Sequence, residues 1–182
     1  DKSRNFLLFD ESAARVYVAQ TGLIGGAYPT HKTVMQAVPG PRALLDGENE
    51  LSVRFESPDL GGLKLVKTWT LKRGSYDMAV AHEVVNTGST AVSPQLYLQL
   101  VRDGNPPPGE SSFYSTFTGP AVYTDAKKYQ KVDFKKIEEG KPEFEKTATN
   151  GYVAMVQHYF ASAWLLGDGI TRELFMRKVD TN

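Results

Sequence analysis

Short runs of alternating apolar and polar residues recur along most of this chain. In the run at 63–71, Leu65, Trp69 and Leu71 fall on one face of an extended chain, while Val66 and Thr68 fall on the other. Successive side chains of a β-strand point to opposite faces, so this spacing predicts a strand. Further strands are predicted on the same grounds at 15–20, 50–55, 77–85 and 92–101.

The most apolar run is NGYVAMVQHYFASAWLL at 150–166. A membrane-spanning helix needs about 20 consecutive apolar residues. Here Gln157, His158 and Ser162 interrupt the run, and Gly-Asp-Gly at 167–169 ends it. Tyr, Phe, Val and Trp favour strands. The run therefore predicts two strands, 152–156 and 159–166, joined by a tight turn at Gln157–His158. Both are apolar on both faces and are expected to lie between two layers.

Turn signals that recur every 8–12 residues or so between such runs are typical of an antiparallel sandwich. The sequence thus predicts an all-β fold and a single domain over 1–182, with one or two short helices. The polar segment 124–141 is the exception. There Asp125 is expected to cap a helical turn at 126–129, followed by a short edge strand at 132–134 and a second helical turn at 135–139.

Charge and composition exclude several classes of function. Lys plus Arg and Asp plus Glu both number 21, and this balance argues against nucleic acid as the main partner. The chain has no cysteine, so disulfides and thiolate metal sites are excluded. A local group of lysines lies within 124–141, where it indicates contact with anionic lipid headgroups or an acidic partner, or else an ordinary solvated surface.

No catalytic signature stands out. His82 and Glu83 are adjacent on a predicted strand, so their side chains point to opposite faces and cannot act as a pair. The three histidines have no metal-ligand spacing, so no metal or cofactor site is predicted. The glycines between Gly22 and Gly26 lack the spacing of a phosphate-binding loop. Aromatic residues between Phe113 and Tyr129 are more typical of a core than of a ligand platform.

Four blocks of the sequence match a known family in order and spacing. They are RVYVAQTGLIGG, LKLVKTWTLKRGSYDMAVAHEVVNTG, FYSTFTGPAVYTDAKKYQKVDFKKI and NGYVAMVQHYFASAWLL. Over about 16–166 the chain resembles the periplasmic domain of the YidC-type membrane protein insertases of Gram-negative bacteria. The resemblance implies an antiparallel β-supersandwich similar to galactose mutarotase. It also implies a longer domain than this chain, flanked in the family by transmembrane insertase segments that this sequence lacks.

The resemblance further implies what the domain does. The parent protein would be an inner-membrane insertase and chaperone that inserts and folds inner-membrane proteins, alone or with the Sec translocon. This domain would lie in the periplasm, bind no cofactor and act as a non-catalytic module that contacts the ancillary subunits SecD/SecF and the membrane surface. Nascent inner-membrane proteins would be partners of the whole insertase.

The family's partner-facing region corresponds roughly to 97–157. Within it the candidate contact residues are aromatic or basic: Phe113, Tyr114, Lys127, Lys128, Lys131, Lys135 and Lys136. An alternative function is a carbohydrate-binding or aldose-epimerase-like domain on the same sandwich. It would require His82 or His158 to converge with Glu83 or Glu56 in one cleft.

Overall fold

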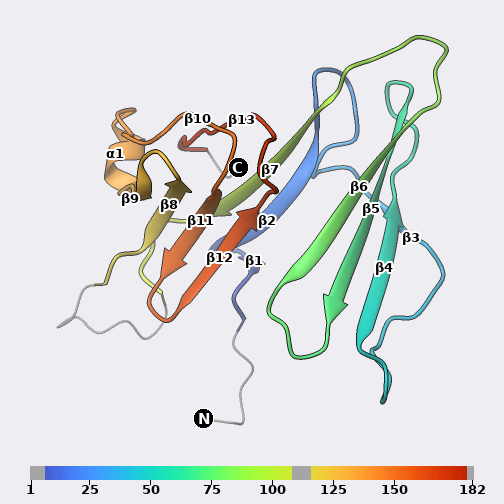
Figure 1. Ribbon diagram of the computed structural model, residues 1–182, viewed down its shortest axis with the longest axis horizontal. Coiled ribbons are helices and arrows are strands. Elements are labelled where there is room, and N and C mark those ends of the chain that lie inside the picture. Colours follow the sequence, from blue (N-terminus) through green and yellow to red (C-terminus); the bar gives the residue numbers. More distant parts are fainter. Residues whose placement is uncertain (1–6, 108–115, 180–182) are drawn as a thin grey trace. The chain divides into compact units, whose positions relative to one another are not determined.

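The computed structural model describes residues 7–107 and 116–179, and their regular structure is almost entirely β (Figure 1). The longer strands are β2 (Arg15–Ile24), β4 (Glu50–Glu56), β5 (Leu63–Lys72), β6 (Met78–Asn86), β7 (Gln95–Arg102), β8 (Gly119–Thr124), β11 (Tyr152–Gln157) and β12 (Phe160–Leu165). The shorter ones are β1 (Asp10–Ser12), β3 (Gln36–Ala37), β9 (Lys128–Lys131), β10 (Thr147–Ala148) and β13 (Arg172–Glu173). One helix of five residues, α1 (Phe134–Glu138), completes the described elements.

The strands form antiparallel sheets that fall into two compact units. The first unit comprises residues 1–19 and 99–182, and the second comprises residues 20–98. The sheet orders are β12-β11-β8-β9 in the first unit and β3-β4-β5-β6 in the second, with a small β10-β13 sheet also in the first. A further sheet, β1-β2-β7, contains the two strands in which the chain passes from one unit to the other.

The first unit has two layers with a mixed core. Tyr17 of β2 is completely buried, and its hydroxyl donates to the Met155 carbonyl oxygen at 3.2 Å and lies 2.5 Å from Ser162 Oγ. Trp164 of β12 donates its indole N–H to the Gln99 carbonyl oxygen at 3.0 Å. These bonds satisfy polar groups of large buried aromatics, so the β12-β11-β8-β9 sheet packs against residues of β2 and β7 without leaving those groups unpaired.

The second unit is built on β5, the strand whose alternation is clearest in the sequence. Leu63 and Leu65 are buried with Leu23 of β2, and Tyr28 and Met35 pack against them. Arg54 covers the opposite face of the sheet. It binds Glu56 of its own strand at 3.2 Å and Glu83 of β6 at 2.8 Å, so it bridges across β5.

The structure confirms the all-β prediction and most predicted strands. The run at 150–166 forms the hairpin β11–β12, as predicted, with its turn at His158–Tyr159, one residue later than expected. The helical turn predicted at 135–139 is α1. The single-domain prediction and the likeness to galactose mutarotase remain predictions.

Three expectations are wrong in detail. Residues 126–129 do not form a helical turn, because Asp125–Lys127 close the β8–β9 hairpin. The short edge strand is β9, several residues before the predicted 132–134. Finally, β12 is not buried on both faces: it is an outer strand of its sheet, and the exposed fraction of Leu165 is 67%.

Candidate functional site

The region predicted to face a partner, 97–157, is built mainly around β8, β9, β11 and α1 of the first unit. The candidate contact residues Phe113 and Tyr114 lie outside the described residues. The five candidate lysines are all exposed. They belong to three neighbouring elements that follow one another in the chain: the β8–β9 turn, β9 and α1.

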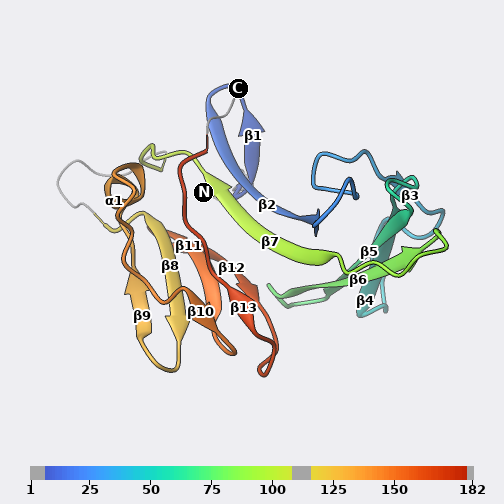
Figure 2. The same ribbon diagram turned by 90° about the horizontal axis from the view of Figure 1, so that it is seen from above.

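The lysines are not gathered in one patch. Lys127 and Lys128 lie at the β8–β9 turn, beside the end of β8. The chain then returns along β8, and the Val132 N–H donates to the Pro120 carbonyl oxygen at 3.0 Å, near the start of β8. Lys135 and Lys136 in α1 therefore lie at the opposite end of the strand, as Figure 2 shows for α1 and the turn.

Two of these lysines contact aromatic rings. Lys131 Nζ lies 5.0 Å from the centroid of the Phe117 ring, and Lys128 Nζ lies 6.0 Å from that of Tyr123. A cation over the face of an aromatic ring is attracted by the ring's quadrupole. Lys128 also has a positive φ of 57°. Its backbone conformation and its contact with Tyr123 place it at a defined point of the turn.

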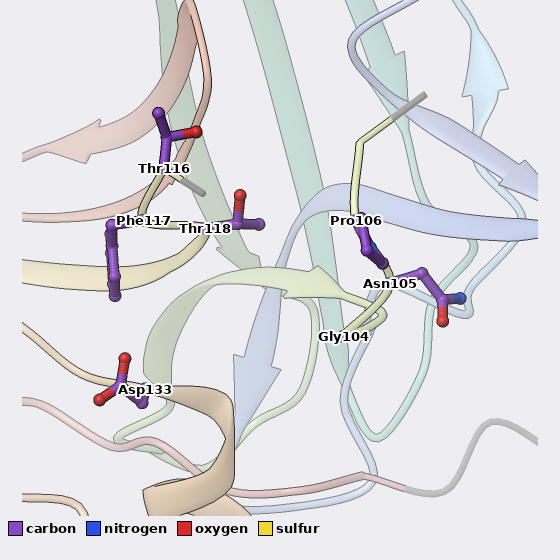
Figure 3. Close-up of a pocket in the computed structure, with 7 residues that line it drawn as sticks. All are labelled: Gly104, Asn105, Pro106, Thr116, Phe117, Thr118 and Asp133. Carbon is purple, nitrogen blue, oxygen red and sulfur yellow. The ribbon is translucent and has the colours of Figure 1, made fainter. Parts of the chain in front are cut away.

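A hollow of about 310 Å³ lies between the loop at residues 104–106, which follows β7, and the segment that leads into β8 (Figure 3). It is lined by Gly104, Asn105, Pro106, Thr116, Phe117, Thr118 and Asp133. Asp103 shapes the loop, because its carboxylate accepts the N–H groups of Val16 at 2.7 Å and Asn105 at 2.8 Å.

The hollow is polar. The Thr118 hydroxyl is buried and has no hydrogen-bond partner among the described residues. Asp133 supplies a carboxylate and Asn105 an amide, so the lining can hydrogen-bond a polar group of a partner or ligand. The sequence alone does not mark Thr118 and Asp133 as site residues. A threonine and an aspartate in separate segments give no signal until the fold brings them together.

The groups required for sugar chemistry are held apart within the second unit. His82 Nε2 lies 2.9 Å from Thr21 Oγ1, whereas Glu83, the next residue on the strand, forms an ion pair with Arg54. Glu56 is bound by the same Arg54. The predicted opposition of His82 and Glu83 across the sheet is therefore confirmed. His158, in the first unit, lies at the β11–β12 turn and packs against Tyr159, with their ring centroids 3.6 Å apart.

Thr21 also accepts a hydrogen bond from a buried lysine. Lys67 Nζ donates to the Thr21 carbonyl oxygen at 2.7 Å, and Lys67 lies opposite His82 in the β5–β6 register. Burial lowers the pKa of Lys67. Burial, and secondarily the charge of Lys67, lower the pKa of His82. Lys67 and His82 therefore make the stability of the folded chain depend on pH. This dependence does not imply a catalytic role for either residue.

Residues 7–107 and 116–179 contain neither a metal-binding cluster nor a membrane-spanning helix. Within these ranges no three His, Asp or Glu side chains come together as a metal-binding group. Within the same ranges no helix has the length and apolar character needed to cross a membrane.

Comparisons with known proteins give a consistent match. The family model described as the YidC periplasmic domain matches residues 1–182. The chain is 50% identical over 182 residues to the membrane protein insertase YidC of Janthinobacterium sp. (strain Marseille), covering 100% of the chain and 32% of that protein. It is 53% identical over 180 residues to the protein of the same name from Dechloromonas aromatica (strain RCB), covering 99% of the chain and 32% of that protein. The chain thus spans about a third of the length of these relatives.

Proposed function

We propose, from the premise that this chain belongs to the YidC periplasmic domain family, that it is a non-catalytic interaction module of a membrane protein insertase. Family membership places the domain in the periplasm, as part of an inner-membrane protein. The whole protein inserts and folds nascent inner-membrane proteins in this proposal, alone or with the Sec translocon. The domain itself contacts the ancillary subunits SecD/SecF.

The observation that carries the proposal is the match of the family model to the whole of residues 1–182. Relatives about half identical over the full chain carry the name membrane protein insertase. At that identity the fold and the general role are shared, whereas the identity of a partner depends on a few surface residues.

The first unit supports a contact role. Lys127, Lys131 and Lys135 are exposed on a turn, a strand and a helix that are held by the β12-β11-β8-β9 sheet. Functional groups on such a scaffold need little ordering when a partner binds, and this lowers the entropic cost of association. The polar hollow between residues 104–106 and 116–118 lies in the same unit.

The partner contact can be tested by photo-crosslinking in the full-length insertase. A photoreactive amino acid would replace Lys127, Lys131 or Lys135, with exposed Lys64 and Lys72 of β5 as controls. We expect SecD or SecF to be captured from the first three positions and not from the controls. Capture from β5 alone, or from no position, would contradict the proposed surface.

The non-catalytic role has its own test. The separation of His82 from Glu83 and Glu56 supports it, because epimerisation of an aldose needs an acid and a base on either side of the reacting carbon. We expect the chain to leave the rate of aldose mutarotation unchanged in polarimetry. Acceleration that is lost in His82→Gln would instead favour the carbohydrate-directed alternative.

A further inference from the structure

Four strands of the first unit place one side chain each in a single line across their sheet. Leu165 of β12 pairs with Tyr152 of β11. Tyr152 in turn pairs with Tyr123 of β8, and Tyr123 pairs with Tyr129 of β9. Directly opposed residues point to the same face. We call Leu165, Tyr152, Tyr123 and Tyr129 the tyrosine row. At the usual spacing of neighbouring strands it extends over about 15 Å.

The row is ordered and partly open to solvent. The Tyr123 and Tyr152 rings stack with their centroids 5.4 Å apart and their planes 9° from parallel. Tyr129 is 45% exposed and Leu165 67% exposed, at the two ends of the row. The tyrosines are held as a preformed surface, so little side-chain entropy remains to be lost when something binds.

The row lies on the face of the sheet that points away from the core. The opposite face carries the buried Val122, Met155 and Trp164. On the same face as the row, Ala121 and Ala154 are buried two residues away from Tyr123 and Tyr152. This face is therefore open at the end of the sheet that carries the β8–β9 turn and along the outer strand β12, where Ala161 and Ala163 are exposed.

Both positive and negative side chains lie at this end of the sheet, and the positive ones are in excess. Lys127 and Lys128 lie in the turn. Arg172 is fixed there by the Thr149, Gly151 and Gly167 carbonyl oxygens. The carboxylates at this end are Asp125 and Asp168. Lys131 lies on the same face two residues beyond Tyr129. Exposed Ile170 adds apolar surface near Arg172.

We propose that the tyrosine row, with Lys127 and Lys128 beside it, rests on the headgroup layer of an anionic lipid bilayer. Tyrosine suits this position, since its ring is apolar and its hydroxyl stays hydrated, and lysines near the surface are attracted by anionic lipids. The site shares Lys127 with the surface proposed to contact SecD/SecF, and the test below contains neither subunit, so the two proposals can fail separately.

A bilayer fits the row better than an acidic polypeptide does. No residue of the row lines the hollow between residues 104–106 and 116–118, and the four side chains stand in one line across a β-sheet, so the row offers a surface and not a groove for a peptide. The parent protein resides in the inner membrane, which gives the bilayer a high effective concentration around this domain.

The test is co-sedimentation of the chain with vesicles of equimolar phosphatidylcholine and phosphatidylglycerol, compared with vesicles of phosphatidylcholine alone. We expect binding to the anionic vesicles that weakens with added salt. The double variant Lys127→Gln/Lys128→Asn should bind about 25-fold more weakly, from about fivefold for each lysine. Asparagine is chosen for position 128 because it tolerates a positive φ.

The matched control is Lys135→Gln/Lys136→Gln, which removes the same charge from the same unit at the other end of β8. It should bind as the unsubstituted chain does. Tyr129→Thr, which places a β-branched residue of high strand propensity on the outer strand β9, should weaken binding even at high salt, because it removes apolar surface. Circular dichroism establishes that each variant is folded.

Three results would overturn the proposal. One is equal loss in the two double lysine variants, since binding would then reflect overall charge. Another is unchanged binding in both Tyr129→Thr and the turn variant. The third is failure to bind vesicles while the chain binds poly-glutamate through Lys127 and Lys128, which would assign the turn to an acidic polypeptide.

Discussion

At the scale of single residues, two glycines in the family-matching blocks are required by close packing: Gly22, inside β2, and Gly151, just before β11. A Cβ at Gly22 would lie 2.6 Å from the Tyr97 hydroxyl oxygen and 2.8 Å from Thr30 Cα. A Cβ at Gly151 would lie 1.9 Å from the Tyr123 carbonyl oxygen. These requirements could not be foreseen from the sequence, because only the fold brings Tyr97 and Thr30 beside Gly22 and Tyr123 beside Gly151.

Gly151→Ala is expected to destabilise the chain strongly. Its φ is +82°, which disfavours any residue with a Cβ, and the Cβ would overlap the backbone of β8. Backbone cannot move aside as a flexible side chain can, so we expect the free energy of unfolding to fall by about 3 kcal/mol or more. Urea denaturation followed by circular dichroism measures this change.

The control for this substitution is Gly169→Ala in the same unit. Gly169 has a similar φ of +86°, but a Cβ at this position would meet no described atom within 4 Å. The free energy of unfolding of this variant should fall only by the cost of the left-handed conformation, about 1 kcal/mol. Equal losses at the two positions would show that the approach of Gly151 to β8 is unimportant.

The buried pair of Lys67 and His82 predicts a loss of stability in mild acid. The folded state lowers the pKa of His82, first by burial and then by the charge of Lys67, so the unfolded chain binds this proton more readily. Stability is therefore complete above the ordinary histidine pKa of about 6.5 and declines as the pH falls below it. Urea denaturation at a series of pH values from neutral to mildly acidic measures the decline.

Two histidine variants identify the source of this decline. His82→Gln keeps a polar group near Thr21 Oγ1 without titrating in this range, so its stability should fall less between neutral and mildly acidic pH. His158→Gln, at the β11–β12 turn, should decline as the unsubstituted chain does. The opposite pattern would exclude His82 as the group responsible.

At the scale of elements, the local sequence pattern predicted the positions of the strands better than it predicted which of their faces are buried. The β11–β12 hairpin follows from β-favouring residues around a short polar interruption. Its apolar character wrongly predicted burial on both faces. Whether a strand lies at the edge of its sheet depends on which strands pair, and the local sequence does not reveal this. In β12, the small residues Ala161 and Ala163 can remain exposed at little cost.

Exposed β12 predicts association at high concentration. It is an outer strand of its sheet, and its sequence FASAWL contains neither charge nor proline, the usual protections of an edge. Ala163→Lys should reduce light scattering on concentration and change the free energy of unfolding by less than about 0.5 kcal/mol, since residue 163 is exposed. Ala154→Lys, at a buried position of neighbouring β11, should unfold the chain. Unchanged scattering in folded Ala163→Lys would show that association does not use this edge.

At the scale of the whole molecule, the family could be identified from the sequence, whereas the candidate surfaces could not. The blocks that carry the resemblance are continuous in the chain. The tyrosine row depends on β8 pairing with β11, although the two strands are far apart in sequence, and a shift of one residue would send Tyr123 to the other face. The lysines of 127–136 look like one group in the sequence, but the return of the chain along β8 separates them.

Strand β2, which has residues in both compact units, predicts that the two units unfold together, as a single domain would. Tyr17 lies in the core of the first unit and Leu23 in that of the second, and both belong to β2. Loss of β2 would therefore remove a fully buried side chain from each core.

The chain's two tryptophans allow a direct test, because Trp164 is in the first unit and Trp69 in the second. In Trp69→Phe and Trp164→Phe, the midpoint of thermal unfolding seen by the remaining tryptophan should coincide with the midpoint seen by far-ultraviolet circular dichroism. Trp164→Phe should also melt at a lower temperature, since it loses the hydrogen bond to Gln99. Separate midpoints within one variant would show that the units unfold independently.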